Sequence, residues 1–220
     1  IGANVSAAKP LQANGGLSSM GFMLAGSGFI VAPEEAARLD ANAPIKPYRN
    51  GKDLMDRPRE ALLIDCFGFT PDEIRLKWPK TFQWLLEYVK PERDHNNRPR
   101  LRDQWWLFAE PRKTLRKALV GLTRYIATVE TAKHRVFQFL DATIAPDHRL
   151  IAIAFNDAYF LGVLSSRAHV VWALAAGGTL EDRPVYNKSR CLDPFPFPAA
   201  VPEQQARIRE LAEQIDAHRK

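Results

Sequence analysis

The sequence predicts an α+β fold, with mainly antiparallel twisted sheets covered by helices and a C-terminal helical extension. Short apolar runs of strand length are bounded by turn residues, as at 61–66 and 150–155. Capped helical patterns lie between and after these runs. With 220 residues and 46% hydrophobic residues, the chain is long enough to bury a sizeable core.

The N-terminal part predicts a strand, a short helix and a second strand. A lead-in at 9–28, rich in Gly, Ser and Ala, runs into a strand at 29–31. A short helix should follow at 33–39, because Pro stands in its first turn and acidic residues lie at the positive end of its dipole. Residues 45–52 predict a turn-rich connection, and the apolar run 61–66 predicts a buried strand.

Helical signals follow that strand. Thr70 can cap a helix in which Pro71 takes the first position and Glu73 the third. A second helical stretch at 81–90 carries an apolar face, which we expect to pack on the sheet. The polar segment 95–102 predicts an exposed loop.

Strands dominate the next part of the chain. Three strand-like runs lie at 124–130, 135–140 and 150–155, and a turn at 146–148 separates two of them. We expect these strands to pair in antiparallel fashion.

The C-terminal part predicts helices around a proline-rich segment. The largely apolar stretch 157–175 predicts a buried helix that ends at Gly177. Prolines alternate through 193–198, so this segment is neither helix nor central strand, and its Phe rings should dock on the core. A charged helical pattern follows. The chain is therefore divided into a domain at 1–200 and a helical extension at 201–220 towards a following region.

Positive charge is concentrated in one stretch of the chain. The net charge is +6, and residues 90–135 hold 12 Lys or Arg against 5 Asp or Glu. Trp105, Trp106, Phe108 and Tyr125 lie within this stretch, which is the pattern expected of a surface that follows phosphates. A solvated basic face that binds nothing charged would have the same composition.

The sequence predicts no catalytic centre and no metal site. Cys66 and Cys191 lie far apart without metal-type spacing, and the five histidines are scattered. No apolar run approaches the roughly 20 residues needed to cross a bilayer. The opening residues 1–10 lack the basic-then-apolar order of a signal peptide. We expect a cytoplasmic protein with no membrane partner.

Several motifs occur in a fixed order along the chain. A Gly-rich entry strand at 21–31 precedes a Tyr-x-x-Gly-x-Asp turn that begins at Tyr48; a basic middle, a Leu-Ser-Ser helix from Leu164 and a Phe-Pro repeat at 195–198 follow. In this order they resemble the target-recognition domain of MmeI-like restriction–modification enzymes, relatives of TaqI-type adenine methyltransferases. Further segments similar to the MmeI-like branch lie at 88–93, 105–108, 125–135 and 177–184.

The resemblance implies a sequence-specific DNA-binding domain of an adenine-specific, S-adenosylmethionine-dependent DNA methyltransferase from a restriction–modification system, with or without a fused endonuclease. Its partners would be double-stranded DNA and the methyltransferase domain of the same polypeptide. S-adenosylmethionine would bind that separate domain, so this chain would hold no cofactor and no catalytic residue. The alternative is a basic scaffold or interaction domain that binds RNA or an acidic protein.

Two groups of residues are candidates for reading bases. The resemblance places Glu181 and Arg183 at the family's specificity positions, with Val185 next on the same side. Arg can hold guanine O6 and N7 while Glu accepts from the amino group of cytosine, and residues two apart on an extended segment share a face. A surface ion pair would explain the same two residues. The second group lies on or beside a strand and comprises Glu130, Lys133 and Arg135, with His148 and Arg149 in the next turn.

Contacts to phosphates depend on charge density more than on geometry. An ordinary solvated helix face would explain residues 112–117 equally well. The residues assigned to phosphate contacts are Arg98, Arg100, Arg102, Arg112, Lys113, Arg116 and Lys117.

Overall fold

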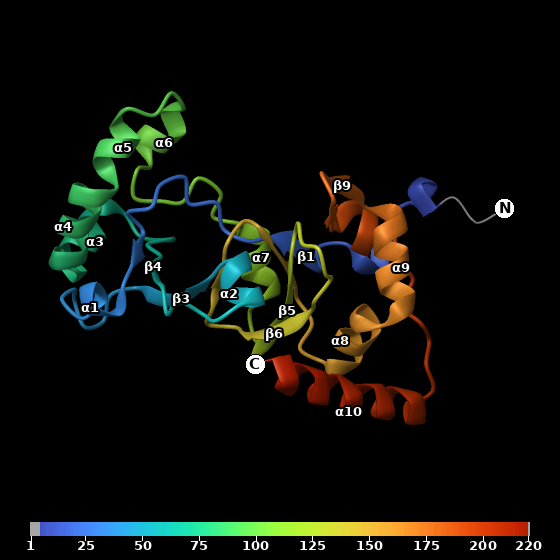
Figure 1. Cartoon of the computed structure of the whole chain (residues 1–220). Coiled ribbons are helices and arrows are strands. Elements are labelled where there is room, and N and C mark those ends of the chain that lie inside the picture. Colours follow the sequence, from blue (N-terminus) through green and yellow to red (C-terminus); the bar gives the residue numbers. More distant parts are fainter. Residues whose placement is uncertain (1–4, 220) are drawn as a thin grey trace. The chain divides into compact units, whose positions relative to one another are not determined.

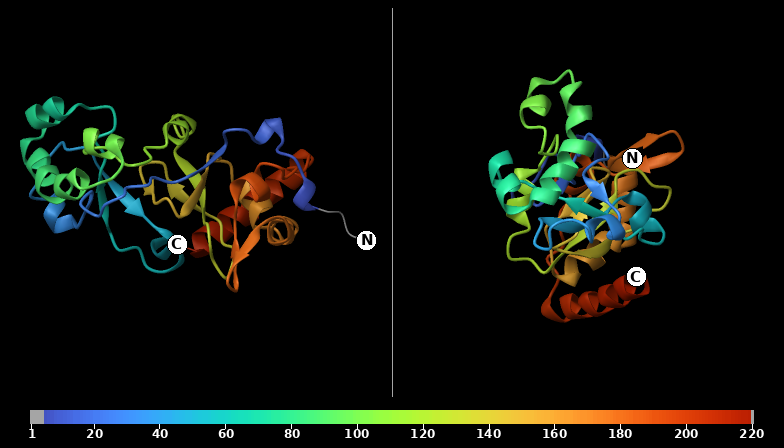
Figure 2. Two further views of the ribbon diagram at one scale, coloured as in Figure 1. Left: turned by 90° about the horizontal axis from the view of Figure 1, so that it is seen from above. Right: turned by 90° about the vertical axis from the view of Figure 1, so that its left-hand side faces the viewer.

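The computed structural model describes residues 5–219. Residues 1–4, the start of the predicted domain at 1–200, and Lys220, the end of the predicted extension at 201–220, lie outside this range. The chain forms two compact units (Figure 1, Figure 2), which we call the hairpin unit (5–21, 113–142 and 149–219) and the inserted unit (22–112 and 143–148). Each unit has its own sheet and its own core.

A four-stranded antiparallel sheet with the order β1-β8-β5-β6 forms the centre of the hairpin unit. Ile126 of β5 pairs with Ile153 on one side and Phe139 on the other, and all three side chains are buried. The predicted antiparallel pairing is therefore confirmed. The elements of this unit are η1 (Val5–Ala7), η2 (Gln12–Asn14), β1 (Ser18–Met20), α7 (Lys113–Ala118), β5 (Arg124–Val129), β6 (Gln138–Asp141), β8 (Leu150–Ile153), α8 (Ala158–Ser165), α9 (Arg167–Ala176), β9 (Gly178–Leu180), β10 (Arg183–Val185), η3 (Lys188–Leu192) and α10 (Pro202–Arg219).

The prediction of a single helix at 157–175 is wrong in one respect, because the helix is interrupted at Ser166. Ser166 has an extended backbone (φ −68°, ψ 153°), and its hydroxyl accepts a hydrogen bond from the amide of His169 at 3.3 Å. A serine at this position competes for backbone hydrogen bonds and starts a new helix. The apolar stretch therefore folds into α8 and α9.

The terminal helix α10 packs along α8 within the hairpin unit (Figure 1). Ala212 is fully buried, the guanidinium of Arg209 binds the Asp157 carboxylate at 2.8 Å, and the Asp216 carboxylate accepts from the amide of Phe139 at 2.7 Å. These contacts make α10 part of the core of this unit.

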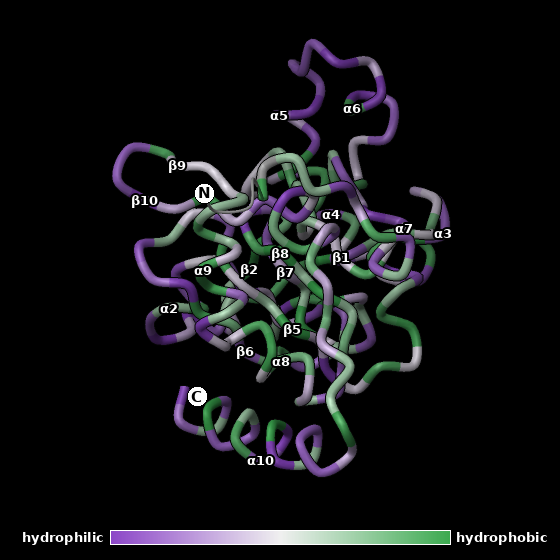
Figure 3. Tube along the Cα trace, turned by 90° about the vertical axis from the view of Figure 1, so that its right-hand side faces the viewer, coloured by the Kyte–Doolittle hydropathy of each residue, from purple (hydrophilic) through white to green (hydrophobic). Residues whose placement is uncertain are grey.

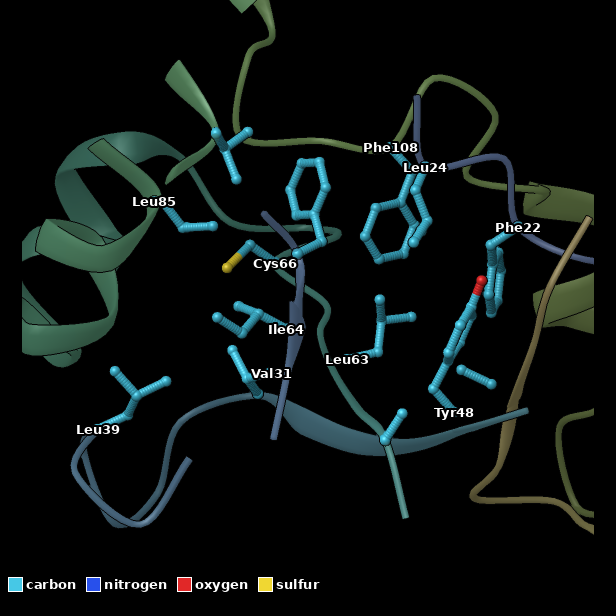
Figure 4. Close-up of a cluster of buried hydrophobic side chains, with 14 of the residues drawn as sticks. Phe22, Leu24, Val31, Leu39, Tyr48, Leu63, Ile64, Cys66, Leu85 and Phe108 are labelled. Carbon is cyan, nitrogen blue, oxygen red and sulfur yellow. The ribbon is translucent and has the colours of Figure 1, made fainter. Parts of the chain in front are cut away.

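The inserted unit contains a mixed sheet with the order β2-β4-β3-β7. Antiparallel pairs join β2, β4 and β3, whereas β3 and β7 run parallel. Figure 4 shows its core, in which Phe22 and Phe108 approach Leu63 from one side and Leu85 lies on the other. The elements are β2 (Ile30–Val31), α1 (Pro33–Ala36), β3 (Ile45–Arg49), α2 (Gly51–Met55), β4 (Leu62–Ile64), α3 (Pro71–Lys77), α4 (Pro79–Tyr88), α5 (Lys90–Asp94), α6 (Pro99–Asp103) and β7 (Ala145–Pro146).

Local signals were sufficient for some elements of this unit and misleading for others. The Thr70 cap and its reciprocal bond from Glu73 are present at the start of α3. Residues 45–52 form β3 and the start of α2 instead of a turn-rich connection, and the predicted loop at 95–102 contains the start of α6. The turn predicted at 146–148 begins in a strand instead: Pro146 lies in β7, which pairs with β3, far away in the sequence.

The α+β fold with antiparallel sheets and a C-terminal helix is confirmed. Among residues 5–219, no single helix has the length and apolar character of a membrane span; the pair α8 and α9, bent by 62°, meets those criteria only when taken together.

Candidate nucleic-acid interface

A β-hairpin, β9–β10, projects from the hairpin unit (Figure 3). Arg183 pairs with Leu180, and Val185 pairs with Gly178. All three residues of β9 are exposed, and in Figure 3 the turn is the most hydrophilic part of the hairpin. The hairpin therefore presents short strands and a polar tip to the solvent.

Glu181 occupies the turn of this hairpin. The prediction that Glu181 and Arg183 lie on one extended segment is wrong, because Glu181 has φ 57° and lies in the turn between the two strands. The two side chains nevertheless meet: the Arg183 guanidinium donates to the Glu181 carboxylate at 2.7 Å. Both remain largely accessible, with 47% and 73% of the side chains exposed.

The second candidate group lies beside the hairpin. Thr131 forms an isolated antiparallel bridge with Val185, and the carbonyl of Glu130 accepts from the amide of Tyr186 at 2.7 Å. The amide of Ala132 donates to the carbonyl of Pro184 at 3.3 Å. The chain that leads to exposed Lys133 is thus fixed to β10.

Arg135 has a different role from the one expected of it. Its guanidinium donates to the carbonyl of Val129, to the hydroxyl of Thr128 at 3.1 Å and to the carbonyl of Pro184 at 3.2 Å. It also lies over the ring of Tyr186 at 5.1 Å, and burial lowers its pKa. Arg135 therefore fastens the hairpin to β5, and its donors point into the protein instead of towards a base.

Of the other members of this group, Glu130 pairs with Arg149 at 3.2 Å in the hairpin unit. His148 belongs to the inserted unit, where its Nδ1 lies 3.1 Å from the Asp147 carboxylate. The hydroxyl of Tyr48 donates to the same carboxylate oxygen at 2.6 Å, and burial raises the pKa of that hydroxyl.

Beneath the hairpin lies a buried network that the sequence did not reveal. The Nε2 atom of His169 lies 2.9 Å from the hydroxyl of Tyr186, and both residues are almost fully buried. Burial, with a smaller contribution from the charge of Arg135, lowers the pKa of His169 to about 4. The imidazole is therefore neutral near pH 7. The only sequence signal that could have indicated Tyr186 is its position directly after Val185, because neighbouring residues of an extended segment alternate between core and surface.

The residues assigned to phosphates are divided between the two units. Arg102 donates to the carbonyl of Asn96 at 2.7 Å, and Arg100 donates to the carbonyl of Ala109. Both arginines are nevertheless exposed. In the hairpin unit, Lys113 and Lys117 lie one turn apart on α7, with exposed side chains. Arg98, Arg100, Arg102 and Arg112 belong to the inserted unit, and Lys113, Arg116 and Lys117 belong to the hairpin unit.

The aromatic residues of the basic stretch are not a stacking surface. Phe108 and Tyr125 are buried in the cores of their units, and Trp105 is 9% exposed. The indole of Trp106 donates to the carbonyl of Phe69 at 2.8 Å. The expectation that these rings interleave with cations on a phosphate-following surface is therefore wrong, because the apolar core takes them up.

No cluster of three or more His, Cys, Asp or Glu side chains suited to a metal ion occurs among the residues that the structure describes. Cys66 and Cys191 are both buried and free, and burial raises the pKa of the Cys66 thiol to about 12. Phe195 is buried in contact with the rings of His169 and Trp172, as expected for a closing segment.

Comparison with known proteins identifies the family of this chain. The family model of the MmeI target recognition domain matches residues 71–199, which is more than half of the 220 residues. The chain belongs to the MmeI target-recognition-domain family.

A solved structure of the type IIL restriction–modification enzyme MmeI in complex with DNA is similar to this chain, with a TM-score of 0.71 and 20% sequence identity. The likeness covers 90% of this chain and 27% of that chain, so this chain spans about a quarter of the length of MmeI. At this identity the likeness shows a shared fold. Among curated proteins, no sequence matches this chain.

The Tyr-x-x-Gly-x-Asp motif that resembled this family has a structural role here. Asn50 caps α2 by accepting from the amides of Lys52 and Asp53. The Asp53 carboxylate in turn binds the guanidinium of Arg59 through both oxygens, at 2.7 and 2.9 Å. Although burial opposes ionisation of Asp53, the hydrogen bonds from Arg59 and Asn50 lower its pKa. The motif therefore stabilises a turn of the MmeI-type fold.

Proposed function

We propose that this chain binds double-stranded DNA and reads its sequence on behalf of an adenine-specific, S-adenosylmethionine-dependent methyltransferase domain in the same polypeptide. The observation that carries the proposal is the match to the MmeI target recognition domain over residues 71–199, which include the hairpin and its exposed ion pair. The parent enzyme would belong to a restriction–modification system and work in the cytoplasm.

The hairpin tip supports this function through its chemistry. A guanidinium can donate two hydrogen bonds to O6 and N7 of guanine, and a carboxylate can accept from the amino group of cytosine. The ion pair between Glu181 and Arg183 is exposed, so exchanging it for contacts with base edges sacrifices about 0–1 kcal/mol. Val185 lies on the same strand as Arg183, two residues further along.

The conformation of Glu181 also supports a functional role. Its φ of 57° lies in the left-handed region, where glycine is favoured at the first position of a tight hairpin turn. A non-glycine residue there costs about 1–2 kcal/mol. Such strain is typical of residues retained for function.

In this proposal the chain supplies recognition and the separate methyltransferase domain supplies S-adenosylmethionine and the methyl-transfer groups. The target adenine would flip out of the duplex into that domain. Recognition by this chain would fix which adenine is presented.

Selection from a random duplex library by the intact protein tests the proposal. The matched variant exchanges the two charges, Glu181→Arg with Arg183→Glu, so that an ion pair remains possible while each position presents the opposite chemistry. We expect the unchanged protein to enrich one sequence and the variant to change a single base-pair position, with the rest of the site retained.

One outcome contradicts the proposal itself, and a second contradicts only the choice of readers. Absence of any enriched duplex, together with tight binding to RNA or to an acidic polypeptide, favours the scaffold interpretation. A specific reader binds its site with about 4–10 kcal/mol more binding free energy than random DNA, whereas a general polyanion binder shows almost no such difference. An enriched site that the charge exchange leaves unchanged removes Glu181 and Arg183 from the set of readers.

A further inference from the structure

The β9–β10 hairpin has two chemically different faces. Directly opposite residues of an antiparallel pair project to the same side, as do residues two apart on one strand. The pairing of Leu180 with Arg183 and of Gly178 with Val185 therefore places these four residues on one face, which we call the outer face. The other face carries Thr179 and Pro184, which pair with each other, and continues into the buried Tyr186; Thr179 is exposed, so only the end of this face at Tyr186 points towards the core.

The two neighbouring glycines at the base of β9 differ in what surrounds them. A Cβ atom on Gly177 would lie 2.4 Å from the carbonyl oxygen of Val185 and 2.8 Å from that of Ala173, so packing requires glycine there. A Cβ atom on Gly178 would meet nothing within 4 Å, and the φ of Gly178 lies outside the left-handed region. Neither packing nor backbone conformation in this chain explains the missing side chain at Gly178. A glycine with this environment suits the close approach of a partner to the backbone.

Leu180 is the second unexplained feature of the outer face. It is 52% exposed, although removing a leucine side chain from water is energetically favourable. It lies opposite Arg183, one residue before the Glu181 turn. An apolar side chain beside polar readers can contact the methyl group of thymine in the major groove.

The charges at the tip limit what can cover this face. Glu181 and Asp182 are both acidic and largely exposed, with side-chain exposures of 73% and 84%. Phosphates would repel these carboxylates, whereas the amino groups of bases can donate to them. A two-stranded ribbon also fits the width of the major groove. The charge pattern therefore favours base edges over the phosphate backbone.

We propose that the outer face of the β9–β10 hairpin lies against base-pair edges in the major groove, with Gly178 at the point of closest backbone approach and Leu180 in contact with a thymine methyl group. The inference rests on the proposed function, DNA recognition, and adds two residues to it.

The test begins with the site that the intact protein selects from random duplexes. Each thymine of that site is then replaced singly by deoxyuridine, which removes only the methyl group. We expect one replacement to weaken binding about four-fold, the factor that corresponds to one buried methyl group. Leu180→Ala should bind the unmodified site about four-fold more weakly and be insensitive to that replacement. Leu174→Ala is the matched control, because Leu174 is similarly exposed (55%) but lies on α9.

The companion variant, Gly178→Ala, tests the close approach. We expect its unfolding midpoint in urea to equal or exceed that of the unchanged protein, and its affinity for the selected site to fall about ten-fold. The proposal is overturned if Leu180→Ala keeps the methyl sensitivity of the Leu174→Ala control, if Gly178→Ala binds with unchanged affinity, or if the selected site contains no thymine. If no site is selected at all, the proposed function itself fails, and this inference fails with it.

Discussion

Arg135 illustrates how one side chain can support a recognition surface without touching DNA. Its guanidinium bridges the carbonyls of Val129 and Pro184, which belong to the β5 end and to β10. We expect Arg135→Met to lower the free energy of unfolding by about 2 kcal/mol, because hydrogen bonds from a charged donor contribute roughly 1.5–3 kcal/mol. Urea unfolding measures this change.

Two further variants separate this anchoring role from a loss of charge. Arg135→Lys should recover only part of the stability, because a single ammonium cannot span carbonyls on both strands. Lys133→Met, at an exposed position, should stay within about 0.5 kcal/mol of the unchanged protein. Equal losses at both positions would contradict the anchor.

His169 makes the stability of the hairpin unit depend on pH. Its pKa is lowered to about 4 in the folded protein, below the ordinary value of 6.5. Between these two values the unfolded chain binds a proton that the folded imidazole does not accept, so stability is complete above pH 6.5 and falls as the pH drops. The total loss by pH 4 is about 3 kcal/mol, and it levels off at lower pH.

The variant His169→Gln isolates this effect. It cannot take up the proton, so its free energy of unfolding should be flat between pH 6.5 and 5 in urea titrations. Below pH 5 a further loss comes from Glu73, because hydrogen bonds from Thr70 lower the pKa of its carboxyl from the ordinary value of 4.5. Asp53 and Asp157 also have lowered pKa values, but their contributions are lost only as the pH falls below their ordinary value of 3.8. A slope that persists in His169→Gln over this window would show that other groups cause it.

At the scale of elements, the contact between α8 and α10 depends on a glycine. Glycine within a helix is usually less stable than alanine by roughly 0.5–1 kcal/mol. At Gly162, however, a Cβ atom would lie 2.5 Å from Cγ2 of Ile208 and 3.3 Å from Cβ of Ala212. Overpacking costs about 1–3 kcal/mol, so we expect the clash to outweigh the gain in helix propensity and Gly162→Ala to destabilise the protein.

A second substitution tests the assignment to this contact. Ile208→Ala removes the Cγ2 atom, so the destabilisation caused by Gly162→Ala should be smaller in the Ile208→Ala background than alone. Calorimetry or urea unfolding of the four proteins gives this coupling. A higher unfolding midpoint for Gly162→Ala alone would mean that α10 packs less closely than the structure has it.

Elements could be predicted from the sequence where their determinants are local. The α3 helix was predicted because Thr70, Pro71 and Glu73 together specify its first turn. The pairing of β7 with β3 could not be predicted, because Pro146 reads locally as a turn and its partner lies about a hundred residues away. The role of Arg135 was missed for the same reason, since sequence gives its charge but not the carbonyls around it.

For the whole molecule, the sequence showed where positive charge is concentrated but not that these charges are shared between two compact units. The Lys and Arg of 90–135 appeared as one stripe, yet those up to Arg112 belong to the inserted unit and those from Lys113 onward to the hairpin unit. The aromatic residues between them entered the cores. Each set of cations must therefore be tested separately for contact with the duplex.

The salt dependence of DNA binding tests the two sets. Each phosphate contact contributes about 0.9 to the slope of log K against log salt concentration, so Lys113→Gln with Lys117→Gln should reduce the slope by about 1.8. Affinity should fall alike for selected and random duplexes, because phosphate contacts carry no base information. Arg98→Gln with Arg102→Gln makes the same test in the inserted unit. The control is Arg207→Gln on α10, whose guanidinium pairs with Glu210 at 2.6 Å and should leave the slope unchanged. A reduced slope in both double variants would mean that both units contact one duplex, whereas a reduction in only one assigns the phosphate contacts to that unit.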